Sequence, residues 1–296
     1  MRAVQVTRYG GPEVLSLTRL ERPSPISTEV LVRVIAAGVN PVDCKTRRGE
    51  GVARWVGPPP FVPGWDVAGV VESTGYGVTR FKVGDAVYGM PRFPRQAGGY
   101  AEYVTAPSHQ FAPIPTNISP IEAAALPLAA LTAWQCLVGV ARLCAGQTVL
   151  VHGASGGVGH LAVQIARALG ATVIATGSRN DREALSARNV DVAVDLAGSE
   201  TETLVETLRD GGLLLAVANG ADDSVIAGCS RRGIRVEQPL VEPDGHDLEE
   251  ISKLVESGKL KVNVEDVMPL AQAAEAHERL EKGGRRGKLV LEIFND

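Results

Sequence analysis

The chain has 296 residues, a length that suits two domains better than one. Its 33 glycines and 18 prolines predict many tight turns, and its hydrophobic content of 45% is ordinary for a globular protein with a sizeable core. The formal net charge of −4 and the lack of a basic run argue against a nucleic-acid partner.

The four cysteines carry no recognisable motif. Cys44, Cys136, Cys144 and Cys229 form no Cys-x-x-Cys pair, which argues against a zinc knuckle or a disulfide framework. The N-terminus has no apolar signal core, and no uninterrupted apolar stretch is long enough to span a bilayer. We therefore expect a cytoplasmic protein without a membrane partner.

The first 120 residues read as short strands separated by turns. Partly alternating or apolar runs bounded by turn residues predict strands at 29–35, 66–72, 85–88 and 100–104. Helical periodicity is rare in this part, so we predict a barrel-like β unit.

The pattern changes near residue 119. Ser119 as N-cap, Pro120 at the first helical position and Glu122 at the third predict a helix start. The Ala-rich stretch that follows runs to about Val140, with Pro127 as a kink or a break between two helices.

A strand, a glycine turn, a helix and a second strand come next. They occupy 147–152, 153–157, 158–169 and 171–176. This βαβ order predicts a parallel, doubly wound sheet. Further strands are expected at 190–196, 213–218 and 234–238.

The glycine turn has the context of a dinucleotide site. A pyrophosphate needs bare backbone N–H groups at a helix N-terminus, and a third glycine lets the helix lie close to the strand. The turn has the frame Ala-x-Gly-x-x-Gly, with alanine where the commonest fingerprint has its first glycine. The expected cofactor contacts are Ala154, Ser155, Gly156, Gly157, Val158 and Gly159. The alternative is a tight turn that binds no ligand.

The end of the second strand favours NADPH. NAD sites carry an acidic residue about 20 positions after the motif, whereas here Ser178 and Arg179 follow the strand and the first acid is Asp181. A serine hydroxyl and an arginine fork suit a 2′-phosphate. Arg179 as a solvated loop charge is the alternative.

Five motifs in order carry a family resemblance. They are Ala37-Gly38-Val39-Asn40-Pro41-Val42-Asp43, Pro63-Gly64-Trp65-Asp66-Val67-Ala68-Gly69-Val70-Val71, Gly98-Gly99-Tyr100-Ala101-Glu102-Tyr103, Leu131-Thr132-Ala133-Trp134 and the glycine turn with its strand. Over essentially its whole length the chain resembles a zinc-independent quinone oxidoreductase of the medium-chain dehydrogenase/reductase superfamily.

The resemblance implies an α/β protein with two domains. A GroES-like β-barrel catalytic domain would span 1–120 and be completed by 263–296, and a Rossmann NADP-binding domain with a doubly wound parallel sheet would span 121–262. The nicotinamide would lie between the domains, and the assembly would be a homodimer.

The resemblance also implies that no metal is bound. Zinc-dependent relatives have a cysteine ligand where this chain has Asn40 and a histidine ligand where it has Trp65. Neither residue fits a tetrahedral N/S zinc shell. No cysteine falls between Cys44 and Cys136, so the zinc lobe of those relatives is absent too.

Three residues are candidates for catalysis. Asn40 offers an amide donor and acceptor to the substrate or the nicotinamide, but it also suits a turn residue that caps its own backbone. Lys45 stands where the family often has tyrosine, and Thr132 resembles the family threonine that faces the nicotinamide. A solvated charge and helix packing are their respective alternatives. Asn219 and Lys288 are further expected cofactor contacts.

The chain departs from the family pattern after Arg179. Residues 185–189 run directly into the apolar run 190–198, so a strand–helix unit is missing and the sheet should be shortened.

The expected activity is hydride transfer from NADPH to a quinone or an α,β-unsaturated carbonyl, which needs little acid help. An enoyl-thioester reductase and a redox sensor that binds NADPH without turnover are the alternatives.

Overall fold

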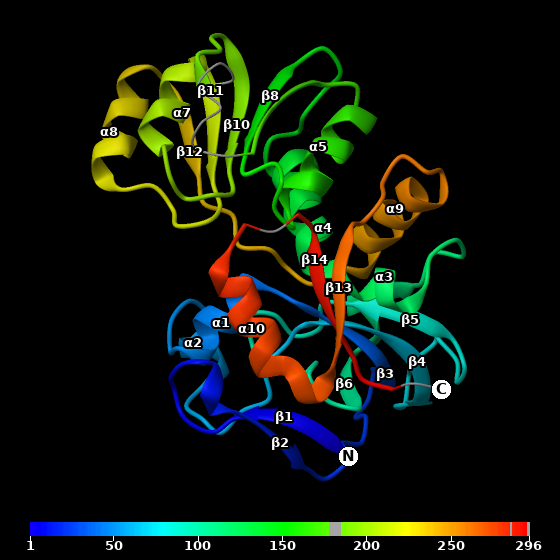
Figure 1. Cartoon of the computed structure of the whole chain (residues 1–296). Coiled ribbons are helices and arrows are strands. Elements are labelled where there is room, and N and C mark those ends of the chain that lie inside the picture. The colour runs from blue at the N-terminus through cyan, green and yellow to red at the C-terminus, as the bar shows by residue number, and fades with distance from the viewer. Residues whose placement is uncertain (178–184, 285, 295–296) are drawn as a thin grey trace. The chain divides into compact units, whose positions relative to one another are not determined.

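The computed structural model describes residues 1–177, 185–284 and 286–294 (Figure 1). The chain divides into two compact units. The first comprises Met1–Leu131, Glu242–Glu256 and Val262–Asp296, and the second comprises Thr132–Val241 and Ser257–Lys261. Relative to the boundaries expected from the sequence, 121–131 and 242–256 lie in the first unit, because the helices that they carry pack on strands of that unit.

A seven-stranded sheet forms the centre of the first unit. Its order is β13-β14-β3-β4-β5-β7, with β6 also paired to β3. β3 (Glu29–Val39) is long enough to pair with β6 through its first residues and with β14 through its last. The other strands of this unit are β1 (Arg2–Val6), β2 (Leu15–Arg19), β4 (Asp66–Thr74), β5 (Ala86–Gly89), β6 (Tyr103–Pro107), β7 (Phe111–Pro113), β13 (Val264–Pro269) and β14 (Lys288–Glu292).

Short helices cover this sheet and carry several polar side chains. They are α1 (Pro41–Arg47), α2 (Ala53–Val56), α3 (Pro120–Ala124), α9 (Gly245–Glu256) and α10 (Ala273–Lys282), with 3₁₀ turns at Pro12–Val14, Ser108–Gln110 and Leu270–Gln272. α3 packs on β3 and β4, and α10 contacts α1 and β14. The helix start at Ser119 is confirmed: its hydroxyl accepts from the Glu122 N–H, and the Glu122 carboxylate accepts from the Ser119 N–H.

The predicted strand over 100–104 was misplaced by three residues, since β6 begins at Tyr103. Tyr100 is fully buried, its N–H bonds the Pro63 carbonyl, and its carbonyl accepts from Val4. Ala101 forms a single bridge with Ala3. This stretch therefore crosses between strands instead of joining the main ladder.

The second unit contains a five-stranded parallel sheet. Its strands are β8 (Thr148–His152), β9 (Thr172–Thr176), β10 (Val190–Asp195), β11 (Leu208–Ala216) and β12 (Arg235–Glu237). The helices are α5 (Gly159–Ala168), α7 (Thr201–Thr207) and α8 (Asp223–Arg231). α4 (Pro127–Trp134) and a π-helical segment (Gln135–Val140) precede the sheet, so Pro127 does begin a new helix.

The strand order confirms the shortened sheet. The order is β12-β11-β10-β8-β9, which places β9 at an edge. A Rossmann sheet has the order 3-2-1-4-5-6, and within 1–177, 185–284 and 286–294 no strand equivalent to number 3 pairs with β9. The sheet is still doubly wound, because β8 pairs with β9 on one side and with β10 on the other.

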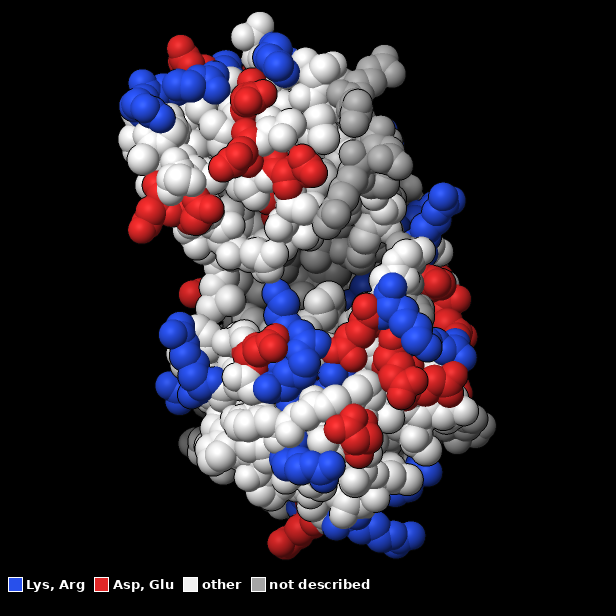
Figure 2. Space-filling view, turned by 60° about the vertical axis from the view of Figure 1, so that its left-hand side comes forward, with Lys and Arg blue, Asp and Glu red and all other residues white. Residues whose placement is uncertain are grey.

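Among the helices that the structure describes, none combines the length and apolarity needed to cross a bilayer. On the face shown in Figure 2, lysines and arginines lie among aspartates and glutamates.

Candidate functional site

The carboxyl edge of the parallel sheet in the second unit brings two loops together. A ligand crevice in such a sheet forms where successive strands diverge to opposite sides, which here is between the ends of β8 and β10. Gly153 follows β8 with φ +84°, and a Cβ there would lie 3.3 Å from the Ala197 nitrogen of the loop after β10. The glycine turn therefore lies at the switch point of the sheet.

Gly156 and Gly159 of this turn differ in how strongly their surroundings exclude a side chain. A Cβ on Gly159 would lie 2.1 Å from the Gly153 carbonyl oxygen and 2.7 Å from Cα of Ala154, so α5 approaches the turn too closely for any side chain. A Cβ on Gly156 would meet only the Gly153 oxygen, at 3.3 Å. Packing thus explains Gly159, whereas a Cβ at Gly156 would make one tight contact with a backbone carbonyl and no severe clash.

The neighbouring polar residues line the same edge. Ser155 is exposed and its hydroxyl donates to the Gly177 carbonyl at 3.3 Å, and the exposed Asn219 donates from Nδ2 to the Gly198 carbonyl at 3.2 Å. Asp195 holds the loop after β10 by accepting from the N–H groups of residues 197 and 198 and from the Thr201 hydroxyl. Ser178 and Arg179, the predicted 2′-phosphate contacts, lie outside the described residues.

A buried polar cluster in the first unit contains Asn40. Its Nδ2 donates to Asp66 Oδ2 at 2.8 Å, and its Oδ1 accepts from Lys288 Nζ. Lys288 also pairs with Asp66 Oδ2 at 3.4 Å, while Asp66 Oδ1 accepts from the Leu128 N–H at 2.7 Å. Asn40, Asp66 and Lys288 are at most 4% exposed. A carboxylate and an ammonium therefore contact the amide of Asn40. Asn40 is also the N-cap residue of α1 and forms a capping box with Asp43, which agrees with the backbone-capping alternative.

Asp43 adds a second carboxylate beside Asn40. Its Oδ2 accepts from the Asn40 N–H at 2.7 Å and from the Tyr100 hydroxyl at 2.9 Å. Asp43 Oδ1 and the Thr46 hydroxyl, both buried, have no hydrogen-bond partner among the described residues. Burial, as the main cause, raises the pKa of Asp43 to about 7.

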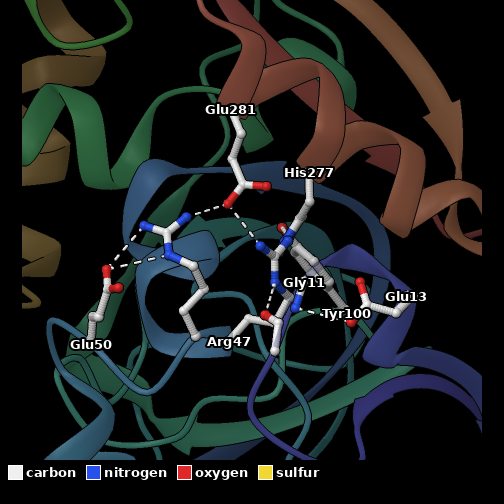
Figure 3. Close-up of polar contacts among 9 residues, drawn as sticks. Gly11, Glu13, Arg47, Glu50, Tyr100, His277 and Glu281 are labelled. Atoms are coloured by element: carbon white, nitrogen blue, oxygen red, sulfur yellow. Dashed lines mark hydrogen bonds and ion pairs between the residues drawn. The ribbon is translucent and has the colours of Figure 1, made fainter.

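The cluster continues through α10 to the surface (Figure 3). Arg47 Nη1 lies 3.0 Å from His277 Nδ1, and His277 Nε2 lies 3.2 Å from the Tyr100 hydroxyl. Because arginine only donates, Nδ1 accepts and Nε2 carries the ring proton. The hydrogen bonds therefore run from Arg47 through His277 and Tyr100 to Asp43.

A pair of arginines closes this network at its outer end. Arg47 is buried and donates to Glu281 Oε1 at 2.7 Å and to the Gly10 carbonyl at 3.1 Å. Arg48 shares the same Glu281 oxygen and also contacts Glu50 at the surface. Burial, followed by the charge of Arg47, lowers the pKa of His277 to about 3, so the ring is neutral at physiological pH.

The two side chains that the family resemblance places at zinc-ligand positions have other partners. Asn40 Nδ2 donates to Asp66, and Trp65 Nε1 donates to the Arg95 carbonyl at 2.7 Å. Burial raises the pKa of the Cys44 thiol to about 12, which opposes the thiolate that a metal needs. Across residues 1–177, 185–284 and 286–294, no three His, Cys, Asp or Glu side chains are grouped to hold a metal ion.

The predicted site residues occupy different environments. Asn40 and Lys288 are in direct contact, although they are far apart in the sequence. Lys45 lies on α1 with a partly exposed side chain, and Thr132 is buried on α4. Their catalytic roles, and the cofactor role of Lys288, stay predictions.

Sequence reasoning missed Arg47 and His277 and took Tyr100 as structural. A fully buried arginine is uncommon, but nothing in the local pattern of α1 predicts its burial. Arg47 and His277 meet only because α1 and α10 pack together.

Comparison with known proteins agrees with this architecture. Residues 27–116 match the family description "Alcohol dehydrogenase GroES-like domain" and residues 169–291 match "Zinc-binding dehydrogenase". The quinone oxidoreductase of Rattus norvegicus is 33% identical, over 98% of this chain and 97% of its own length. The chain belongs to the quinone oxidoreductase family of the medium-chain dehydrogenase/reductase superfamily. It is therefore an NAD(P)-dependent oxidoreductase.

Two further members of the superfamily extend the comparison. The 2-methylene-furan-3-one reductase of Solanum lycopersicum is 35% identical, over 98% of this chain and 79% of its own length. A mycobacterial protein solved as a complex with NADPH has a TM-score of 0.86 and 29% identity, over 99% of this chain and 100% of that chain.

The alignment with the rat quinone oxidoreductase also bears on the shortened sheet. It extends over 326 positions, more than the 296 residues of this chain. The rat enzyme therefore carries residues that have no counterpart here, in agreement with β9 as the edge strand of the described sheet.

Proposed function

We propose that the chain catalyses hydride transfer from NADPH to a quinone without a metal. The observation that carries the proposal is the glycine turn at the switch point of the second sheet, where the close approach of α5 requires glycine at 159. Identity of 33% to a quinone oxidoreductase over nearly the whole chain supports the choice of acceptor.

The cofactor would supply the hydride, and the second unit would hold it. Backbone N–H groups of residues 155, 157 and 158 would bind the pyrophosphate at the start of α5, where the helix dipole favours an anion. The N–H groups of Ala154 and Gly156 already donate to the Thr176 and Gly153 carbonyls. Ser155 and Asn219 lie on the same sheet edge and supply hydroxyl and amide groups. Ser178 and Arg179 would select the 2′-phosphate of NADPH.

Asn40 would contact the acceptor or the nicotinamide. One hydrogen of its Nδ2 donates to Asp66, and the second is available for the oxygen on which negative charge develops. Because Lys288 and Asp66 hold both ends of the amide, the donor is fixed in direction before the substrate arrives. The Thr132 hydroxyl and the Lys45 ammonium are further candidates for polar contacts with the cofactor or the acceptor.

An α,β-unsaturated carbonyl is the second candidate acceptor. Its support is the 35% identity to the 2-methylene-furan-3-one reductase of Solanum lycopersicum. Addition of hydride to the β-carbon also moves negative charge to an oxygen, so the same amide donor would serve both acceptors.

The test is oxidation of NADPH and NADH, followed by absorbance, with a panel of quinones, alkenals and acyl-thioesters. We expect turnover with quinones and a preference for NADPH that falls at least tenfold in the S178A/R179A variant. R231A, at the end of α8, is the matched control for loss of a positive charge. Tight NADPH binding without turnover of any acceptor would favour the redox sensor, and a preference for NADH would remove the proposed roles of Ser178 and Arg179.

The homodimer that the family resemblance implies is also part of this proposal. Sedimentation of the purified protein at several concentrations tests it, with a monomer at micromolar concentration as the contradicting result.

A further inference from the structure

The charge balance around Asn40 depends on the protonation of Asp43. Two carboxylates approach this residue: Asp66 bonds the side-chain amide and Asp43 bonds the backbone N–H. One ammonium, Lys288, contacts Asp66. If both carboxylates were ionised, the buried cluster around Asn40 would carry one uncompensated negative charge.

The hydrogen bonds of Asp43 suit a neutral acid. Both hydrogen bonds of Asp43 converge on Oδ2, whereas Oδ1 has no partner among the described residues and is buried. A charged oxygen left unsolvated in the interior costs more free energy than a neutral hydroxyl without an acceptor. Oδ1 is therefore the oxygen on which a proton would reside.

The groups that face Asp43 do not supply a compensating cation. Lys288 on β14 is shared with Asp66 on β4, and Arg47 on the same helix is engaged by Glu281 and His277. The remaining neighbours are neutral: the His277 ring on α10, the Tyr100 hydroxyl and the Cys44 thiol, the last two with raised pKa values because of burial.

We propose that Asp43 is a positioning residue that carries its proton in the working enzyme, so that Asn40 lies in a cluster with no net charge. Without this proton, Asp43 would be a buried anion beside Asn40. The Asn40 amide is the group that we expect to donate to the acceptor oxygen on which negative charge develops. The kinetic part of this inference rests on the proposed function, whereas the protonation of Asp43 does not.

The first test is the pH dependence of stability. In D43N, the amide oxygen accepts the same two hydrogen bonds and the amide nitrogen takes the place of Oδ1. The difference in unfolding free energy between D43N and the wild type should grow in favour of D43N as the pH rises from about 5 to about 8. A constant difference across this range would overturn the proposal. This arm needs no turnover, so it also stands if the proposed function fails.

The second test uses an infrared pH titration. The wild type should show a carboxylic-acid carbonyl band that disappears as the pH is raised through neutrality and that D43N lacks. Persistence of the same band in D43N would assign it to another group and overturn the proposal.

The third test uses kinetics and a pair of buried tyrosines. The hydrogen bond from Tyr100 lowers the pKa of Asp43, so Y100F should move the alkaline fall in kcat to higher pH. Y88F removes a comparable buried hydroxyl that bonds Leu248 and Ser252, and it should not move the profile.

The expected kinetic signature is a split between kcat and KM. In the wild type, kcat with a neutral quinone should fall roughly tenfold per pH unit above the break, while KM stays nearly constant. In D43N this alkaline fall should be absent. A fall in D43N that matches the wild type would show that another group titrates and would overturn the kinetic part.

Discussion

The candidate site of the second unit is formed mainly by a glycine-rich backbone turn, whereas the polar cluster of the first unit is formed by buried side chains, several of them charged. At the carboxyl edge of the parallel sheet, the important groups are N–H donors and glycines within seven consecutive residues, 153–159. In the first unit, Asn40, Asp66, Tyr100, His277 and Lys288 come from distant parts of the chain and meet through hydrogen bonds. The comparison teaches that a site made of backbone tolerates sequence change around it, while a site made of buried charges depends on every partner.

Acid should affect the first unit most strongly through His277. Its pKa is depressed to about 3 in the fold, against 6.5 for the free side chain. The unfolded chain therefore binds more protons between these values, and stability that is complete above pH 6.5 is lost as the pH falls toward 3. The loss from this one group is on the order of 5 kcal/mol.

The variant pair H277Q and H246Q measures this effect. Glutamine at 277 can still accept from Arg47 and donate to Tyr100, but it does not titrate in this range. Denaturant unfolding between about pH 4 and 7 should show a weaker pH dependence for H277Q than for the wild type, and no change for H246Q, whose side chain is 76% exposed. Equal pH dependence of H277Q and the wild type would contradict the buried neutral ring.

Arg47 and Arg48 both contact Glu281, and they allow a buried positive charge to be compared with a more exposed one. The Arg47 side chain is 1% exposed and that of Arg48 is 36% exposed. R47M leaves the His277 ring and the Gly10 carbonyl without their donor and leaves Glu281 with Arg48 alone. It should cost about 3–5 kcal/mol of unfolding free energy, because two acceptors in the interior lose their hydrogen bond. R48M should cost less than about 1 kcal/mol, and the cost should fall with added salt. Similar losses for both variants, measured by denaturant unfolding, would remove the distinction.

Substitutions of Gly156 and Gly159 distinguish an effect on NADPH binding from an effect on the stability of the second unit. G159A forces a shift of the turn or of α5, so it should lose about 1–3 kcal/mol of stability and bind NADPH weakly. In G156A the new Cβ would lie 3.3 Å from the Gly153 oxygen, so we expect a smaller loss of stability, less than about 1 kcal/mol. NADPH binding should still weaken at least tenfold, because the methyl group would hinder the approach of the pyrophosphate. Thermal unfolding and NADPH titration by fluorescence measure the two quantities. Unchanged NADPH affinity in G156A would contradict the proposed phosphate site.

Much of the second unit could be predicted from local sequence. The run from residue 147 to 176 specifies strand, turn, helix and strand, because hydrophobic periodicity and glycine positions act over a few residues. The direct passage from 185–189 to 190–198 also predicted a shortened sheet, in agreement with the five strands found in the described part of the second unit. The alanine in place of the first glycine did not alter this topology.

The sequence by itself determined the family, the two kinds of domain and the position of the glycine turn. Only the tertiary structure decided that Asn40 is held by Asp66 and Lys288, that Arg47 is buried, and that His277 belongs to the same network. The physical reason is the range of the interactions. Turn and helix preferences depend on neighbours in the chain, whereas a buried charge is stabilised by partners that only the packing of α1, α10, β4 and β14 brings within hydrogen-bond distance.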